Sequence, residues 1–182
     1  MKIAMIAGSN RANATSTSLS LYIKKVMESE GHEVTLIDLY KQPLPFYGSA
    51  GADTDANLTE MRQAVLHSEA IVLSTPEYHG SMSGVLKNAL DFMGGDHFDS
   101  KAVLSVSSAG GAVGVASLTQ MQGIVRNMHG VNCPEWISIG GAQREFNPDG
   151  SPKSPDVQTR VHKTVPYFLK LAAMLKSPAV AK

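Results

Sequence analysis

Residues 3–19 read IAMIAGSNRANATSTSL, and this segment contains the first sign of the architecture. A short apolar run, residues 3–7, stops at Gly8 and Ser9, and a polar turn leads to a helical pattern that begins near Ser16. A buried strand, a turn and a helix in this order form the repeating unit of α/β proteins. The turn also predicts an anion site, because the N–H groups at a helix start carry partial positive charge.

The turn is rich in groups that can bind a phosphate. Five hydroxyl side chains and one guanidinium stand close to the helix start: Ser9, Thr15, Ser16, Thr17, Ser18 and Arg11. Because capping a helix needs fewer groups, we expect a terminal phosphate monoester here, with simple N-capping as the alternative. Two other types of phosphate-binding loop are excluded. A P-loop requires a Lys close after the glycine, but no Lys follows Gly8 before Lys24. The dinucleotide fingerprint requires glycines at positions where this chain has Asn10 and Asn13. A mononucleotide is therefore favoured over a dinucleotide.

The rest of the chain repeats the alternation of strand and helix. Strands are expected at 2–7, 33–38, 70–74, 101–107 and 131–138, and helices at 16–29, 58–68, 82–93, 115–128 and 155–176, with loops at 41–57, 94–100 and 140–156. Pro134 should break the last strand, and Pro166 should kink or limit the last helix. The first, third and fourth strands are apolar without alternation, which indicates burial on both faces of a parallel sheet. We predict an α/β three-layer sandwich, one domain over residues 1–182, with a five-stranded parallel sheet of order 2-1-3-4-5.

Two further loops should reach the same edge of this sheet as the first. The segment TPEYHGSMSG, residues 75–84, places an aromatic ring, Tyr78, and a polar imidazole, His79, just after the third strand. Each residue alone suits an ordinary rim or surface position, but beside a phosphate loop the pair favours contact with a planar ring. The segment SSAGGAVG, residues 107–114, has glycines that let a ligand approach the backbone, although a flexible turn is the alternative.

Composition and charge exclude several classes of protein. The chain has 16 basic and 16 acidic residues and no Lys/Arg run, so nucleic acid is not an expected partner. No apolar run approaches the roughly 18 residues of a membrane span, and the first apolar run is too short for a signal peptide. Cys133 is the only cysteine, which excludes an internal disulfide and a cysteine-bound cluster. These features favour a cytoplasmic protein.

Two motifs resemble a known family. The sequence GSNR at 8–11 with its Ser/Thr cluster, and PEYHGSMSGVLKNALDF at 76–92, resemble the NADPH-dependent FMN reductases, which have a flavodoxin-like fold and include azo-, chromate- and quinone-reducing flavoproteins. The resemblance implies that the FMN phosphate is bound by Ser9, Arg11, Ser16, Thr17 and Ser18. It implies that the isoalloxazine and ribityl groups are lined by Pro76, Glu77, Tyr78, His79 and Gly80, and that the pocket is closed by Ser108, Ala109, Gly110 and Gly111. The first loop is one residue longer than the common GSxRxxS spacing, so the choice among residues 15–18 stays open.

The same resemblance implies an FMN-dependent oxidoreductase that takes electrons from NADPH or NADH. The acceptor would be a small oxidised molecule such as a quinone, an azo compound, a flavin or a metal oxyanion, and no protein side chain need act as acid, base or nucleophile. The alternative is a flavodoxin-type electron carrier, but such carriers are strongly acidic and this chain is neutral. Relatives of this kind are commonly homodimers or homotetramers. Met82, Met93, Met121, Met128 and residues 43–47 would then either face a partner or fill the core.

Overall fold

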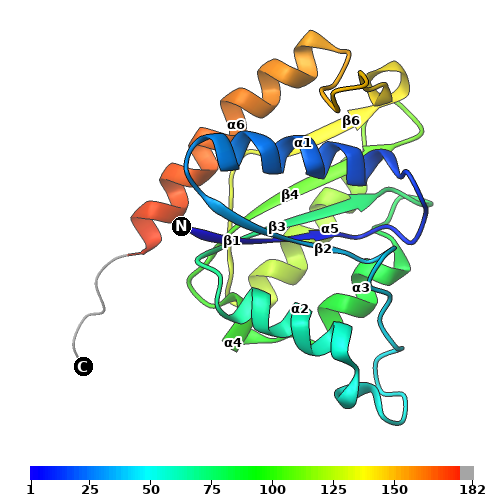
Figure 1. Ribbon diagram of the computed structural model, residues 1–182, viewed down its shortest axis with the longest axis vertical. Helices are drawn as coiled ribbons and strands as arrows, with labels where there is room; N and C mark the ends of the chain where they lie inside the picture. The colour runs from blue at the N-terminus through cyan, green and yellow to red at the C-terminus, as the bar shows by residue number, and fades with distance from the viewer. Residues whose placement is uncertain (177–182) are drawn as a thin grey trace.

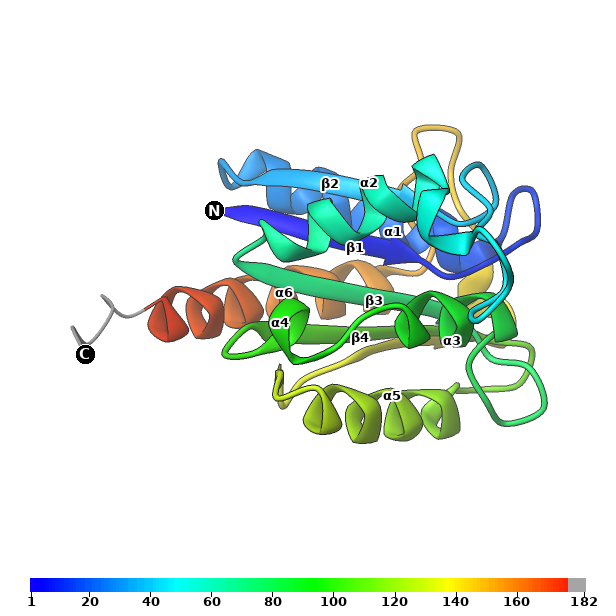
Figure 2. The ribbon, with the colours of Figure 1, turned by 90° about the horizontal axis from the view of Figure 1, so that it is seen from below.

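The three strands with continuous apolar sequence form the centre of a parallel sheet with helices on both faces (Figures 1 and 2). The structure is a computed structural model that describes residues 1–176; the last six residues of the expected domain lie outside the described residues. The strands are β1 (Lys2–Ala7), β2 (Glu33–Asp38), β3 (Ala70–Pro76), β4 (Ala102–Ala109), β5 (Val131–Asn132) and β6 (Ile137–Gly140). The helices are α1 (Thr15–Ser29), α2 (Ala56–Leu66), α3 (Gly84–Asp91), α4 (Gly95–Phe98), α5 (Val115–Asn127) and α6 (Pro155–Leu175), with the 3₁₀ turns η1 (Ala52–Thr54) and η2 (Gly141–Arg144). Within the described residues, no helix has the length and hydropathy needed to cross a membrane.

The strand order is β2-β1-β3-β4-β5, and all neighbours are parallel, as predicted. The predicted fifth strand is interrupted at Pro134, as expected, and forms two short strands that lie one after the other beside β4. Val131 of β5 is opposite Ala102 at the start of β4, and Ile137 of β6 is opposite Val106 near its end. Pro134 lies between them, and its lack of an N–H explains the interruption of the ladder. Together β5 and β6 fill the fifth position, so the topology is flavodoxin-like.

Each face of the sheet has its own core. Helices α1 and α6 cover one face, where Leu19 and Ile23 pack with Phe168. Helices α2, α3, α4 and α5 cover the other face, where Leu86 and Met121 belong to the same buried cluster. Helix α6 continues through Pro166, which lies on its exposed side, because buried residues before and after the proline hold both halves against the sheet.

The packing corrects one sequence expectation and decides between two alternatives in another. The stretch after Gly94, expected to be a loop, contains the short helix α4, whose Phe98 is fully buried and fixes this turn to the core. The four methionines considered as interface residues are buried and fill the core. Within residues 43–47, in contrast, Phe46 and Tyr47 are 82% and 62% exposed.

Candidate functional site

The loops that follow β1, β3 and β4 meet at one pocket, because the carboxyl ends of neighbouring parallel strands lie at the same edge of the sheet. The pocket has a volume of about 290 Å³. Its lining comes from the first loop (Arg11, Asn13, Ala14, Thr15, Ser16), the second loop (Pro76, Glu77, Tyr78), the third loop (Ser108, Ala109, Gly110) and, in addition, Arg144. We call it the three-loop pocket.

The start of α1 is open toward this pocket. Its N-cap is Ala14, whose side chain cannot accept a hydrogen bond from the helix. The hydroxyl oxygens of Ser16, which lines the pocket, and of Thr17, which does not, are buried and have no hydrogen-bond partner among the described residues. Buried polar atoms are rarely left unpaired, since desolvation without a partner costs about 1–3 kcal/mol. Unpaired hydroxyls and free helix N–H groups together fit an anion with several oxygens.

Two other predicted phosphate residues are engaged within the loop itself. Ser9 is fully buried, and its hydroxyl accepts a hydrogen bond of 3.2 Å from the backbone N–H of Arg11. Ser18 donates its hydroxyl to the carbonyl of Ala14 at 3.4 Å. Neither residue is part of the pocket lining. These contacts shape the turn in which Arg11 and Ser16 lie.

Gly8 joins the first loop to α3. A Cβ at this position would come within 2.7 Å of both the Leu86 Cβ and the Ser74 carbonyl oxygen, so only glycine fits. Its N–H donates to Ser74 at 2.8 Å, and its carbonyl accepts the hydroxyl of Ser83. Ser83 also accepts the N–H of Leu86 and thereby caps α3. The first loop therefore stands on a closely packed base.

The second loop ends in a tight turn that carries its tip away from the pocket. Tyr78 and Ser81 exchange two backbone hydrogen bonds of 2.9 and 3.0 Å, and the residues between them, His79 and Gly80, have φ of +52° and +73°. Positive φ at both central positions is the type I′ turn of two-residue hairpins. Tyr78 thus lines the pocket, whereas His79 and Gly80 are exposed and do not.

Glu77 lines the pocket but directs its carboxylate to α5. Its Oε2 accepts the N–H of Ser117, in the first turn of that helix, at 2.9 Å. This contact satisfies a helix N–H and places negative charge at the positive end of α5. The carboxylate therefore fixes the second loop to α5 instead of facing an anion in the pocket.

The third loop is held from beneath by side chains and by close backbone contacts. The hydroxyl of Ser138 on β6 accepts the N–H of Gly114 at 2.8 Å, and Ser107 donates to the Gly114 carbonyl at 2.9 Å. A Cβ at Gly140 would lie 2.1 Å from the carbonyl oxygen of Gly111, so this glycine lets the loop pack on β6. Gly110 lines the pocket, whereas Gly111 does not.

Arg144 is the one lining residue that lies outside the three predicted loops. It ends η2, within a segment that has no periodicity, and its Nε donates to the Gly141 carbonyl at 3.2 Å. Within residues 1–176, neither Arg144 nor Arg11 belongs to an ion pair. Since Glu77 is engaged with α5, the two guanidinium groups make the pocket cationic.

The remaining chemistry-bearing residues do not add a second reactive centre. Cys133 is 2% exposed, and burial raises the pKa of its thiol, so the reactive thiolate is disfavoured. Among the described residues, no group of His, Cys, Asp and Glu side chains is arranged to bind a metal ion.

Comparison with known proteins points in the same direction as the pocket. The family described as NADPH-dependent FMN reductase matches residues 1–144. The chain is 31% identical over 156 residues to the FMN-dependent NADPH-azoreductase of Staphylococcus aureus, and the match covers 83% of each chain. Among solved structures, the flavoenzyme NAD(P)H:(acceptor) oxidoreductase FerB from Paracoccus denitrificans has a TM-score of 0.76, with 21% identity and coverage of 94% of this chain and 97% of that one. An apo NADH:FMN oxidoreductase has a TM-score of 0.77, with 20% identity and coverage of 97% and 91%.

Proposed function

Because the chain belongs to the NADPH-dependent FMN reductase family and is an FMN-dependent NAD(P)H oxidoreductase, we propose that the three-loop pocket binds its FMN, with the phosphate at the start of α1. The observation that carries this proposal is the pair of buried, unpartnered hydroxyls on Ser16 and Thr17. A phosphate monoester supplies the acceptor oxygens that these donors lack.

Charge in the pocket supports the same orientation. A phosphate dianion is stabilised by more than one cation, and Arg11 and Arg144 line the pocket from two separate segments. Thr15 is a further hydroxyl residue that the first loop contributes to the lining. Ser9 and Ser18 belong to this site as residues that hold the loop in shape, through the hydrogen bonds they make with it.

The ring end of the cofactor then lies between the second and third loops. Pro76, Glu77 and Tyr78 form one side, and Ser108, Ala109 and Gly110 form the other. His79, Gly80 and Gly111 lie at the rim, next to these lining residues. When bound, FMN would supply the redox chemistry that links the reduced nicotinamide to the acceptor. The chain binds and orients the ring, and we assign no side chain as acid, base or nucleophile.

We propose that the acceptors are small and planar or anionic: quinones, azo compounds, free flavins and metal oxyanions. The azoreductase of Staphylococcus aureus supports an azo compound as the first acceptor to test. A flavodoxin-type electron carrier, the alternative considered from the sequence, has the same fold, but the family match and the azoreductase relative favour the reductase. Neutral overall charge argues against the carrier, since a carrier that docks on basic partners is acidic.

Assembly and location are also proposals. We propose a homodimer or homotetramer in which Phe46 and Tyr47 contact a second copy, because two large exposed aromatic side chains are costly to leave in water. Phe46 also lines a small pocket together with Asn10 of the first loop, so this contact would border the FMN site. We propose the cytoplasm as the location, with the described residues acting as one FMN-binding domain.

The deciding experiment is anaerobic reduction of the FMN-loaded protein followed by reoxidation. NADPH or NADH should bleach the flavin absorbance, and a quinone or azo dye should restore it repeatedly with steady consumption of NAD(P)H. A carrier would be reduced slowly by NAD(P)H and would not sustain turnover with a small acceptor. Size-exclusion chromatography with light scattering of wild type and Phe46→Ser tests the assembly.

A further inference from the structure

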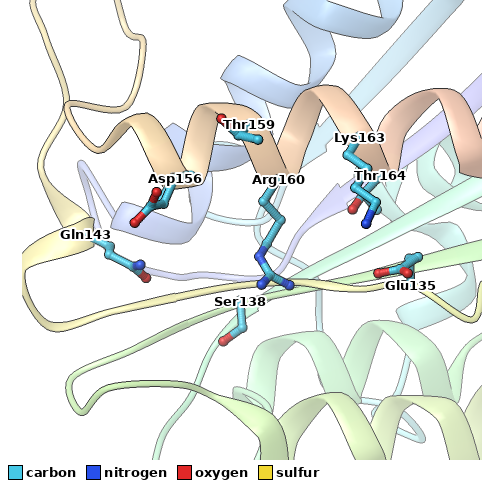
Figure 3. A pocket seen from close by; sticks show the side chains of 9 residues that line it. Glu135, Ser138, Gln143, Asp156, Thr159, Arg160, Lys163 and Thr164 are labelled. Carbon is cyan, nitrogen blue, oxygen red and sulfur yellow. The ribbon is translucent and has the colours of Figure 1, made fainter.

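A second pocket lies outside the three loops, between β6 and the first half of α6 (Figure 3). Its volume is about 450 Å³, within the roughly 300–1,000 Å³ of small-molecule sites. Its walls are mostly polar, and the residues that matter here are Ser138, Gln143, Arg160 and Lys163, with Glu135 and Asp156 toward its two ends. We call it the α6 pocket.

Two cations of α6 face this pocket without partners of their own. Arg160 and Lys163 are three residues apart, so they lie on the same side of the helix. Figure 3 shows the Arg160 side chain extending from α6 toward Ser138. Neither cation forms an ion pair within the part of the chain that the structure describes, although Glu135 and Asp156 line the same pocket. The two charges are therefore available to a ligand.

The α6 pocket shares a wall with the three-loop pocket. Gln143 and Arg144 are consecutive residues of η2, and Gln143 lines the α6 pocket while Arg144 lines the three-loop pocket. Ser138 lines the α6 pocket and also accepts the N–H of Gly114 from the third loop. A ligand in the α6 pocket would lie directly beside the flavin site.

We propose that the α6 pocket binds the adenosine end of NADPH, with Arg160 and Lys163 at its 2′-phosphate. This inference rests on the proposed function, because it requires nicotinamide to meet FMN in the neighbouring pocket. A dinucleotide longer than its nicotinamide needs a second place to bind, and this pocket adjoins the first. Arg and Lys are the side chains that pair with phosphate, and the carboxylates at the ends can accept a ribose hydroxyl or the adenine amino group.

The direct test is binding of 2′,5′-ADP, a fragment that carries the 2′-phosphate but no nicotinamide. Calorimetric titration of the FMN-loaded wild type should show tighter binding of 2′,5′-ADP than of 5′-AMP. Arg160→Ala and Lys163→Ala should each weaken 2′,5′-ADP roughly tenfold, the scale of a lost hydrogen bond to a charged group, and leave 5′-AMP nearly unchanged. In turnover, both variants should raise KM for NADPH but not for NADH.

Matched controls remove the same charges elsewhere. Lys170→Ala lies further along α6, and Arg126→Ala lies on α5 at the opposite face; both residues are exposed. Neither control should alter 2′,5′-ADP binding. Wild-type-like binding of 2′,5′-ADP by Arg160→Ala and Lys163→Ala would overturn the assignment of the α6 pocket, and so would an equal rise in KM for NADPH and for NADH. Neither result would contradict the oxidoreductase activity, as long as the wild type oxidises NAD(P)H. A rise only in the KM of an anionic acceptor overturns it as well. Absence of NAD(P)H oxidation by wild type is a separate result and contradicts the proposed function itself.

Discussion

The starts of α1 and α3 are a natural comparison, because both helices begin at the same edge of the sheet and both follow a loop after a central strand. At α3, Ser83 is 2% exposed and both donates to Gly8 and accepts from Leu86. At α1, Ala14 caps nothing, and the hydroxyls of Ser16 and Thr17 are buried without partners. A hydroxyl at a helix start therefore stabilises the fold in one case and has no partner among the described residues in the other, where we propose that a ligand binds.

The other helix starts sharpen the contrast. Asp55 caps α2 through a 2.8 Å hydrogen bond from Leu58, and Glu77 accepts from Ser117 in α5. Helix α6 also lacks a side-chain cap, but its first residue is Pro155, which has no N–H to satisfy. The start of α1 thus lacks a side-chain cap, although several hydroxyl residues lie beside it in the sequence.

The largest expected effect is the stabilisation of the apoprotein by FMN bound at the start of α1. FMN at about 1,000 times its Kd should raise the free energy of unfolding of the apoprotein by about 4.1 kcal/mol, because FMN binds the folded state and closes the start of α1. Urea unfolding with and without FMN measures this difference. Riboflavin at the same concentration should give a much smaller rise, and an equal rise would show that the phosphate is not bound.

The next effect is that of Arg11. Arg11→Ala should weaken FMN binding by about 1.5–3 kcal/mol, the scale of hydrogen bonds to charged groups, and should leave riboflavin binding nearly unchanged. Fluorescence titration of apoprotein with both flavins separates the two. Arg126→Ala on α5 is a matched control, since Arg126 is also exposed and is absent from the pocket lining. Equal loss for FMN and riboflavin would contradict a role at the phosphate.

Removing the hydroxyl that closes α3 should act on stability. Ser83→Ala should lower the free energy of unfolding of the apoprotein by about 1–2 kcal/mol, because the cap is lost and the Gly8 carbonyl loses its donor. The measurement is urea unfolding without FMN, with Ser81→Ala, on the partly exposed turn, as the control. Wild-type stability of Ser83→Ala would contradict the claim that the Ser83 hydroxyl stabilises the fold at the start of α3.

Removing the hydroxyl left open at α1 should act on binding instead. Ser16→Ala should weaken FMN by about 0.5–1.5 kcal/mol and leave the unfolding free energy of the apoprotein the same or slightly higher, since no intramolecular hydrogen bond is lost. The two serines together form the sharpest experiment: one variant loses stability, and the other loses affinity. If Ser16→Ala destabilised the apoprotein as Ser83→Ala does, the two helix starts would not differ.

Most of the fold could be predicted from the sequence because its signals are strong and local. The apolar runs of β1, β3 and β4 are long enough to indicate a buried parallel sheet, and their alternation with helices limits the topology. Pro134 was the only residue that indicated the split of the last strand into β5 and β6. Helix α4 was missed because four residues are too few to show periodicity.

The site was less accessible to sequence reasoning, because its details depend on tertiary contacts. Arg144 lines the pocket from η2, the turn that follows Gly140, and the close packing of Gly140 on Gly111 beside that turn is a tertiary contact that no local pattern encodes. The engagement of Glu77 with α5 likewise depends on a residue 40 positions away. The three loops could be predicted, but which of their residues line the pocket could be predicted only in part.

The smallest expected effect is at His79, which the type I′ turn holds outside the pocket lining. His79→Ala should lower turnover only partially and change the free energy of unfolding by no more than about 0.5 kcal/mol, because the side chain is exposed and hydride transfer belongs to the cofactor. Steady-state NADPH oxidation with a quinone, run beside a thermal melt and a count of bound FMN, separates activity from stability and loading. Tyr78→Ala is the matched comparison, since Tyr78 lines the pocket and its loss should reduce turnover or FMN affinity more. Complete loss of turnover in His79→Ala with FMN fully bound would instead identify the imidazole as a proton donor.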